Sequence, residues 1–98
     1  MDTNGQNYQS IIEAHFPAYV AIPSAILCDA RLKASEKILL ALINIYGDYR
    51  PDYGEIQAVA GIGQKTAQRD LRHLDDLGYI HVVRNDGHGK TYRIGRGW

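Results

Sequence analysis

The residues best suited to chemistry in this chain lie in the stretch GIGQKTAQRDLRHLDDLGYI, which runs from Gly61 to Ile80. Apolar residues recur there at intervals of three and four, which predicts a helix over residues 64–77 with one apolar side. That side consists of Ala67, Leu71, Leu74 and Leu77. The opposite side consists of Lys65, Gln68, Arg69 and Arg72. Cationic and amide groups of this kind bind phosphates and base edges, so the helix is suited to the major groove of DNA.

The first turns of this helix hold the residues that we expect to contact bases. Gln64 and Gln68 can pair with adenine, and Lys65 can pair with guanine. The methyl group of Thr66 can contact thymine. This is the end of the second helix that helix-turn-helix proteins place against base edges, so the spacing and the residue types agree.

The charge of the later turns limits the expected contact. Arg69 and Arg72 continue the same side and can reach phosphates. Asp75 and Asp76 occupy the last turn, where negative charge repels phosphates and opposes the helix dipole. We therefore expect DNA contact through residues 64–72 only.

Other segments are predicted to position this helix. Residues 55–60 form a short helix, and the turn at residues 61–63 joins it to the next one as a helix-turn-helix. Ser35 caps an earlier helix that Gly47 ends. Its sequence KILLALINIY is apolar almost all round, which predicts burial at the centre of the domain. Asp70 falls within the apolar side of the later helix and requires a polar partner or a wet edge.

Two β-rich segments, residues 79–84 and 91–94, follow the helix and flank the sequence NDGHGK, which strongly favours a hairpin. The alternative to a DNA-contacting wing is a polar turn, residues 85–90, selected for the backbone geometry of Asp86, Gly87 and Gly89. The side chains of this hairpin that could contact DNA are Arg84, His88, Lys90 and Arg93.

The order of these elements indicates a mainly α protein with a small β-hairpin (α+β). We expect a winged helix-turn-helix with a core of three to four helices and a two-stranded wing. We assign residues 17–96 to this domain and residues 1–16 to a flexible N-terminal arm, because the arm is polar and without periodicity. Pro23 opens a short helix that runs to about Cys28, and that cysteine is predicted to pack as a small hydrophobe.

The segments YVAIPSAILCDARLKASEKILLALI and GIGQKTAQRDLRHLDDLGYI together carry a family resemblance. Over residues 18–94, the chain resembles the winged helix-turn-helix domains of bacterial, plasmid and phage replication-initiation proteins. The resemblance implies a role in replication initiation or its control on a mobile element, with replication proteins as partners. In one departure, Gly63 stands where such helices often begin with serine, but glycine caps a helix almost as well.

Composition restricts the remaining possibilities. The chain of 98 residues fits one small domain, and no apolar run approaches the ~20 residues that span a membrane. The polar start MDTNGQNYQS lacks the pattern of a secretory signal, so we expect a cytoplasmic protein. Residues 1–60 carry four basic and seven acidic residues, and residues 61–98 carry seven and four, so the balance changes from −3 to +3. The positive half contains the candidate helix and hairpin.

Neither an enzyme nor a metal or cofactor site is expected. The histidines have no ligand spacing, and the chain has one cysteine. The sequence GIGQKT lacks the order of a phosphate-binding loop, and no nucleophile, histidine and carboxylate form a recognisable set. His73 lies beside the basic side and is interpreted as a surface or groove-side residue. The histidines are His15, His73, His81 and His88.

Double-stranded DNA is therefore the expected ligand, and single-stranded DNA is the alternative. Tyr49 and Tyr53 could stack on bases, although a tyrosine more often faces the core with its hydroxyl at the edge. About six basic contacts would give a monomer limited affinity, so we expect a homodimer formed through residues 8–22. The alternative functions are a transcriptional regulator of the same fold and a winged-helix module that docks a protein partner.

Overall fold

A computed structural model describes residues 16–98, so all but the last residue of the expected arm and about half of the expected dimer segment lie outside the described residues. The described part is a small α+β fold with four helices and a two-stranded antiparallel hairpin, compatible with a winged helix. No helix within it is long and apolar enough to cross a membrane. The elements are α2 (Ser24–Leu27), α3 (Ala34–Tyr46), α4 (Tyr53–Ala60), α5 (Gln64–Asp76), β1 (Ile80–Asn85) and β2 (Lys90–Ile94).

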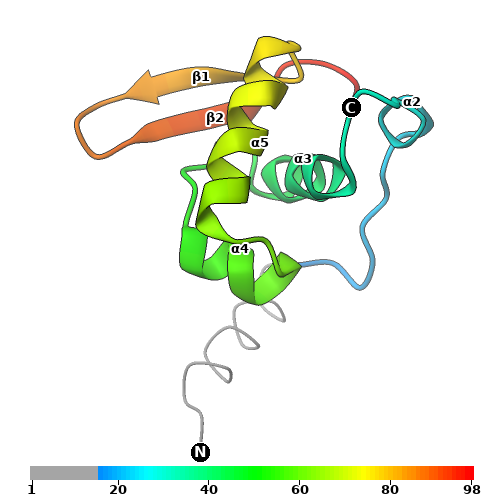
Figure 1. The fold of residues 1–98 in the computed structure, drawn as a ribbon, viewed down its shortest axis with the longest axis horizontal. Coiled ribbons are helices and arrows are strands. Elements are labelled where there is room, and N and C mark those ends of the chain that lie inside the picture. The colour runs from blue at the N-terminus through cyan, green and yellow to red at the C-terminus, as the bar shows by residue number, and fades with distance from the viewer. Residues whose placement is uncertain (1–15) are drawn as a thin grey trace, which may run out of the picture.

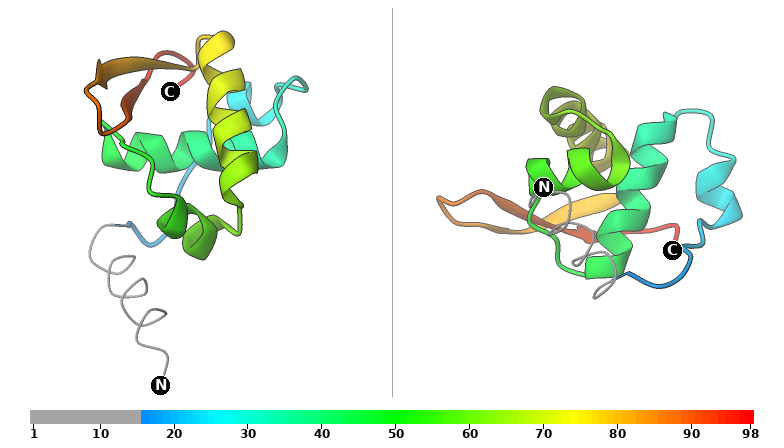
Figure 2. Two further views of the ribbon diagram at one scale, coloured as in Figure 1. Left: turned by 60° about the vertical axis from the view of Figure 1, so that its left-hand side comes forward. Right: turned by 90° about the horizontal axis from the view of Figure 1, so that it is seen from below.

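Helix α3 lies at the centre of the fold, as its apolar sequence predicts. Figure 1 shows α5 lying across it, with the hairpin on one side and α2 on the other, and Figure 2 shows the same arrangement from two further directions. The buried side chains of α3 include Leu39, Leu40 and Ile43. Against them pack Ala67, Leu71 and Leu74 of α5, so the predicted apolar side of α5 is confirmed.

The predicted cap of α3 is wrong. Its N-cap is Lys33 rather than Ser35, and the backbone N–H of Lys33 donates a hydrogen bond of 2.7 Å to Oε1 of Glu36. A carboxylate in the first turn thus satisfies the helix start, which leaves the Ser35 hydroxyl free for a tertiary contact. The predicted end at Gly47 is confirmed, and this glycine has a φ of 82°.

Helix α4 begins two residues earlier than the sequence interpretation placed it. The side chain of Asp52 accepts a hydrogen bond of 3.0 Å from the backbone N–H of Glu55, which caps the helix before Tyr53. The helix ends at Gly61, whose φ of 70° is left-handed, as a glycine turn requires. Gly63 is the N-cap of α5, as expected, and α5 ends at Asp76, one residue early.

The hairpin forms where it was predicted, with Gly87 and Gly89 at positive φ in its turn. Strand β1 carries a bulge between Val82 and Arg84, which places one extra residue opposite β2. A single bridge joins Tyr49 to Tyr92, with backbone hydrogen bonds of 2.8 and 2.7 Å, so the loop before α4 pairs with the outer side of β2.

The N-terminal part of the described chain differs from expectation at Pro23, at Cys28 and at the start of the packed domain. Helix α2 is one short turn, and Pro23 precedes it as the N-cap rather than as its first residue. Cys28 is exposed rather than packed, because only Ile26 of this turn is buried. Phe16 contacts the ring of Tyr46 edge-on, with centroids 6.1 Å apart, so the packed domain begins at least one residue before the predicted boundary.

Candidate nucleic-acid interface

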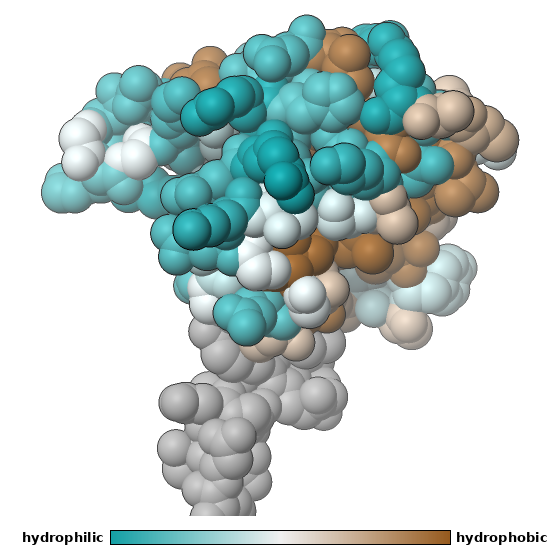
Figure 3. All heavy atoms as spheres, in the orientation of Figure 1, coloured by the Kyte–Doolittle hydropathy of each residue, from teal (hydrophilic) through white to brown (hydrophobic). Residues whose placement is uncertain are grey.

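The polar side of α5 faces solvent. The predicted site residues Gln64, Lys65, Gln68, Arg69 and Arg72 are exposed, and Thr66 is half-buried. Figure 3 shows a mainly hydrophilic surface over this helix and the hairpin. Because Ala67, Leu71 and Leu74 fix the other side in the core, this orientation is determined by packing.

The cations of α5 have no acidic partner among residues 16–98. None of Lys65, Arg69 and Arg72 forms an ion pair there. Arg84 and Lys90 of the hairpin likewise have none within that range. These five side chains are therefore available to phosphates at no cost in broken ion pairs.

The remaining cation predicted to bind DNA is already engaged. Nε and Nη2 of Arg93 donate hydrogen bonds of 2.7 and 2.9 Å to the carboxylate of Asp48. This contact with Arg93 lowers the pKa of Asp48 below its usual value. Arg93 thus joins β2 to the loop before α4, and its charge is neutralised locally.

A second ion pair holds the tip of the hairpin. Nη2 of Arg50 donates hydrogen bonds of 3.2 and 3.1 Å to the two carboxylate oxygens of Asp86. Asp86 also accepts a hydrogen bond of 3.1 Å from the backbone N–H of His88, which lowers the pKa of this carboxyl. The His88 side chain is exposed at the tip. The turn therefore has the backbone geometry that the alternative interpretation assigned to it, and its exposed side chains remain free to contact a ligand.

A hollow of about 310 Å³ separates α5 from the hairpin, and we call it the helix–hairpin hollow. It brings together Gln68 and Arg72 of α5 with Lys90 of β2, which the sequence interpretation predicted from separate motifs. Asp75 also faces the hollow, so the acidic last turn is not directed away from the cations. The hollow is lined by Tyr53, Gln68, Leu71, Arg72, Asp75, Lys90 and Tyr92.

Two polar contacts that the sequence did not reveal attach α5 to the start of α3. Asp70 is 1% exposed, and its carboxylate accepts a hydrogen bond of 2.5 Å from Oγ of Ser35. Nδ1 of His73 contacts Oε2 of the buried Glu36. The required partner of Asp70 is therefore a serine 35 residues earlier in the chain. No cluster of three or more metal-ligating side chains occurs in the described part of the chain.

The two candidate stacking tyrosines have different environments. Tyr49 is 4% exposed and stacks on Tyr46 with centroids 5.1 Å apart, so it faces the core, as the more common interpretation expects, and a base cannot stack on it. Burial raises the pKa of the Tyr49 hydroxyl. Tyr53 is half-buried and lines the helix–hairpin hollow, so it is the one of the two that a base can reach.

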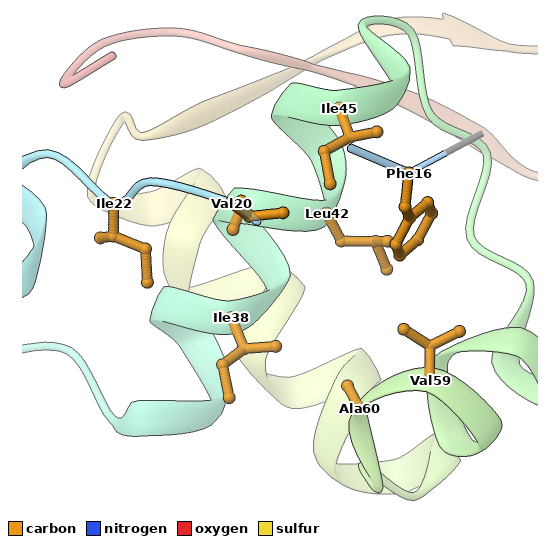
Figure 4. A pocket seen from close by; sticks show the side chains of 9 residues that line it. Phe16, Val20, Ile22, Ile38, Leu42, Ile45, Val59 and Ala60 are labelled. Atoms are coloured by element: carbon orange, nitrogen blue, oxygen red, sulfur yellow. The ribbon is translucent and has the colours of Figure 1, made fainter. Parts of the chain in front are cut away.

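A second surface is apolar. Helices α3 and α4 and the segment before α2 enclose a groove of about 220 Å³, and Figure 4 shows the side chains that line it. Ile38 and Val20 are 43% and 40% exposed there, which is high for large apolar side chains. The groove is lined by Phe16, Val20, Ile22, Ile38, Ala41, Leu42, Ile45, Val59 and Ala60.

Comparison with known proteins does not indicate a function for this chain. The sequence matches no protein-family model, and neither a curated protein nor a solved structure is significantly similar to the chain. The exposed side of α5 and the helix–hairpin hollow are therefore the features from which a function has to be inferred.

Proposed function

We propose that this protein binds duplex DNA as a winged helix-turn-helix protein, with α5 in the major groove and the hairpin as the wing. The observation that carries the proposal is the exposed side of α5. It presents three cations, Lys65, Arg69 and Arg72, that have no acidic partner among residues 16–98. The other side of the helix is packed in the core. A helix that is packed on one side can insert its exposed side into the major groove while it keeps its place in the domain.

Each part of the surface has a separate role in this proposal. The first turns of α5, with Gln64, Lys65, Thr66 and Gln68, contact base edges. Arg69 and Arg72 bind phosphates, and Lys90 and Arg84 extend the phosphate contacts onto the hairpin. The hollow beside Gly63 at the N-terminus of α5 is lined mainly by the proposed base-reading residues, which gives base edges room to approach.

The biological role that we propose is replication initiation or its control on a mobile element, in the cytoplasm. This part of the proposal is supported by the family resemblance of residues 18–94. A transcriptional regulator of the same fold is the alternative, and the location of the bound DNA site distinguishes the two. The small number of free cations favours a homodimer on a repeated site, which sedimentation at tens of micromolar protein tests.

A protein-docking module is the second candidate function. The observation that favours it is the apolar groove between α3 and α4, where large apolar side chains are exposed. Such surfaces mark interaction sites in many proteins. A protein that failed to bind any DNA would make this groove its main functional surface.

The test is fluorescence anisotropy with random duplex and single-stranded DNA at about 50 and 200 mM salt, a range that reveals counterion release. The informative variant combines Arg69→Ala with Arg72→Ala. Its charge-matched control combines Lys33→Gln with Lys37→Gln, because neither lysine forms an ion pair in the described chain. Nζ of Lys37 donates a hydrogen bond to the carbonyl of Leu27, the last residue of α2, and glutamine can keep this contact.

We expect the α5 variant to lose roughly tenfold in duplex affinity on all sequences, while the control keeps the affinity of the unmodified protein. Equal losses in the two variants would assign the binding to general charge rather than to α5. Weak binding that neither variant changes would overturn the proposal.

A further inference from the structure

We propose that the helix–hairpin hollow binds one unpaired nucleobase, so that the protein prefers duplex DNA that continues into a single strand. The inference rests on the proposed function, since it assigns a more specific ligand to the same surface. It comes from the combination of an accessible aromatic ring, an amide, a carboxylate and two cations in one hollow.

The aromatic ring is that of Tyr53. It lies between the helix–hairpin hollow and a second hollow of about 200 Å³ on the side of the hairpin tip, and it lines both. Tyr92 also lines both, but it is only 9% exposed and forms part of the core. Tyr53 is thus the ring on which a base can stack, and stacking accepts any base. A volume of about 310 Å³ is at the lower end of small-molecule sites (~300–1,000 Å³), which suits a single flat ring.

The carboxylate of Asp75 makes the hollow more suitable for a base than for a bare phosphate. Asp75 faces the hollow beside Arg72 and Lys90, yet it forms no ion pair with either among residues 16–98. A phosphate group would be repelled by this carboxylate. The amino group of an unpaired cytosine or adenine can instead donate a hydrogen bond to it. Thymine has no amino group, and its single donor, the ring N3–H, lies between two carbonyl oxygens that the carboxylate repels.

The position of the hollow connects it to the proposed duplex. Gln68 lines both the helix–hairpin hollow and the hollow at the N-terminal end of α5, where base contacts are proposed. Gln68, Arg72 and Asp75 follow one another at intervals of four and three along α5, so they form one row on the side that faces the hairpin. A strand that leaves the duplex beside Gln68 therefore enters the hollow that also holds Arg72, Lys90 and the Tyr53 ring.

The experiment compares one short blunt duplex with the same duplex extended by a short overhang of dC, dA or dT. Affinities are measured by anisotropy competition with the full chain. We expect the dC and dA overhangs to bind roughly tenfold tighter than the blunt duplex, with dT several-fold weaker than dC. Tyr53→Leu should abolish the overhang preference and Tyr53→Phe should keep it, while both retain the blunt-duplex affinity.

Asp75→Asn is the second variant, and its exposed position makes it safe for folding. For a base site, it reduces the preference of dC over dT, because the amide oxygen still accepts from cytosine while the amide NH₂ can now donate to thymine O4. For a phosphate site, it would instead tighten all overhangs equally and would overturn the inference. Equal binding of blunt and extended duplexes by the unmodified protein would also overturn it, while leaving the proposed duplex binding intact. Absence of binding to every DNA would overturn both.

Discussion

Helix α5 and the hairpin border the same hollow, but different interactions hold them in place. Three residues of α5, Ala67, Leu71 and Leu74, are at most 2% exposed and belong to the core. Strand β1 is exposed from Val83 to the turn. On β2, Tyr92 is buried, and it packs in the core. The outer part of the hairpin is held by two ion pairs, Arg93 with Asp48 and Arg50 with Asp86, whose side chains are 44–53% exposed.

This difference explains why the cations of the two elements are used differently. Apolar burial positions α5, so its charged side chains are not needed for structure. An exposed ion pair contributes only ~0–1 kcal/mol, and the hairpin uses one of its cations in such a pair. The helix is therefore a rigid element that supplies free charge. The base of the hairpin is fixed by Ile80, Tyr92 and the Tyr49–Tyr92 bridge, and only its outer part depends on weak surface contacts.

The largest expected effect concerns the stability of the two elements. Leu74→Ala should lower the free energy of unfolding by about 2–5 kcal/mol, because the side chain is fully buried. Val83→Ala on the hairpin should change it by less than ~0.5 kcal/mol, since Val83 is 36% exposed. Urea denaturation followed by circular dichroism measures both. Similar losses in the two variants would show that the hairpin is as firmly packed as α5.

The next effect concerns the salt dependence of DNA binding. Replacing Arg69 and Arg72 by alanine should reduce the slope of log affinity against log salt by about 2, because each phosphate that the protein neutralises adds ~0.9 to that slope. Replacing Arg84 and Arg93 should reduce it by only about 1, because Asp48 already neutralises Arg93. Anisotropy titrations at several salt concentrations give both slopes. A larger reduction for the hairpin pair would reverse the comparison.

A smaller effect on DNA affinity should follow from freeing Arg93 from its ion pair with Asp48. Asp48→Asn removes the partner of Arg93, so the affinity for duplex DNA should rise a few-fold and the salt slope should steepen by about 1. The same substitution combined with Arg93→Ala is the control and should show no gain. A gain that persists in the double variant would come from the removal of negative charge at position 48 rather than from a freed arginine.

The smallest expected effect is the loss of the Arg93–Asp48 ion pair at acidic pH. Hydrogen bonds from Arg93 keep the pKa of Asp48 below its ordinary value of 3.8. A lowered pKa means that the ion pair stabilises the folded hairpin above the ordinary value and is lost as the pH falls through the folded-state pKa. NMR titration of Asp48 should give a midpoint below 3.8, with the Arg93–Asp48 pair lost at still lower pH while the Tyr49–Tyr92 bridge keeps the hairpin in place. A midpoint at or above 3.8 would contradict the ion pair.

Local sequence patterns were enough to predict the buried side of α5 and the glycine turns. The three- and four-residue spacing of Ala67, Leu71 and Leu74 identified the buried side of α5, because it follows from helix geometry alone. The glycines at positions 61 and 87 identified the turns for a similar reason, since positive φ favours glycine. The Asp52-x-x-Glu55 capping pattern also marks the start of α4, so the sequence contains a local signal for that boundary as well.

Contacts between distant segments could not be predicted in this way. Asp70 lies 35 residues from Ser35, and Arg93 lies 45 residues from Asp48. Nothing in the local sequence distinguishes Arg93, which is engaged, from Lys90, which forms no ion pair among residues 16–98. Tertiary packing also decided that Tyr49 is buried and Tyr53 accessible, although the two lie only four residues apart in the chain.

The exposure of Cys28 provides a reporter that needs no engineering. It is the only cysteine in the chain, and it lies at the end of α2, on the side of α3 away from the hairpin (Figure 1). A maleimide dye would therefore label the protein at a single defined point, remote from the side of α5 on which DNA is proposed to lie. Energy transfer from this dye to an acceptor on either end of an asymmetric duplex would then reveal the polarity of the bound DNA.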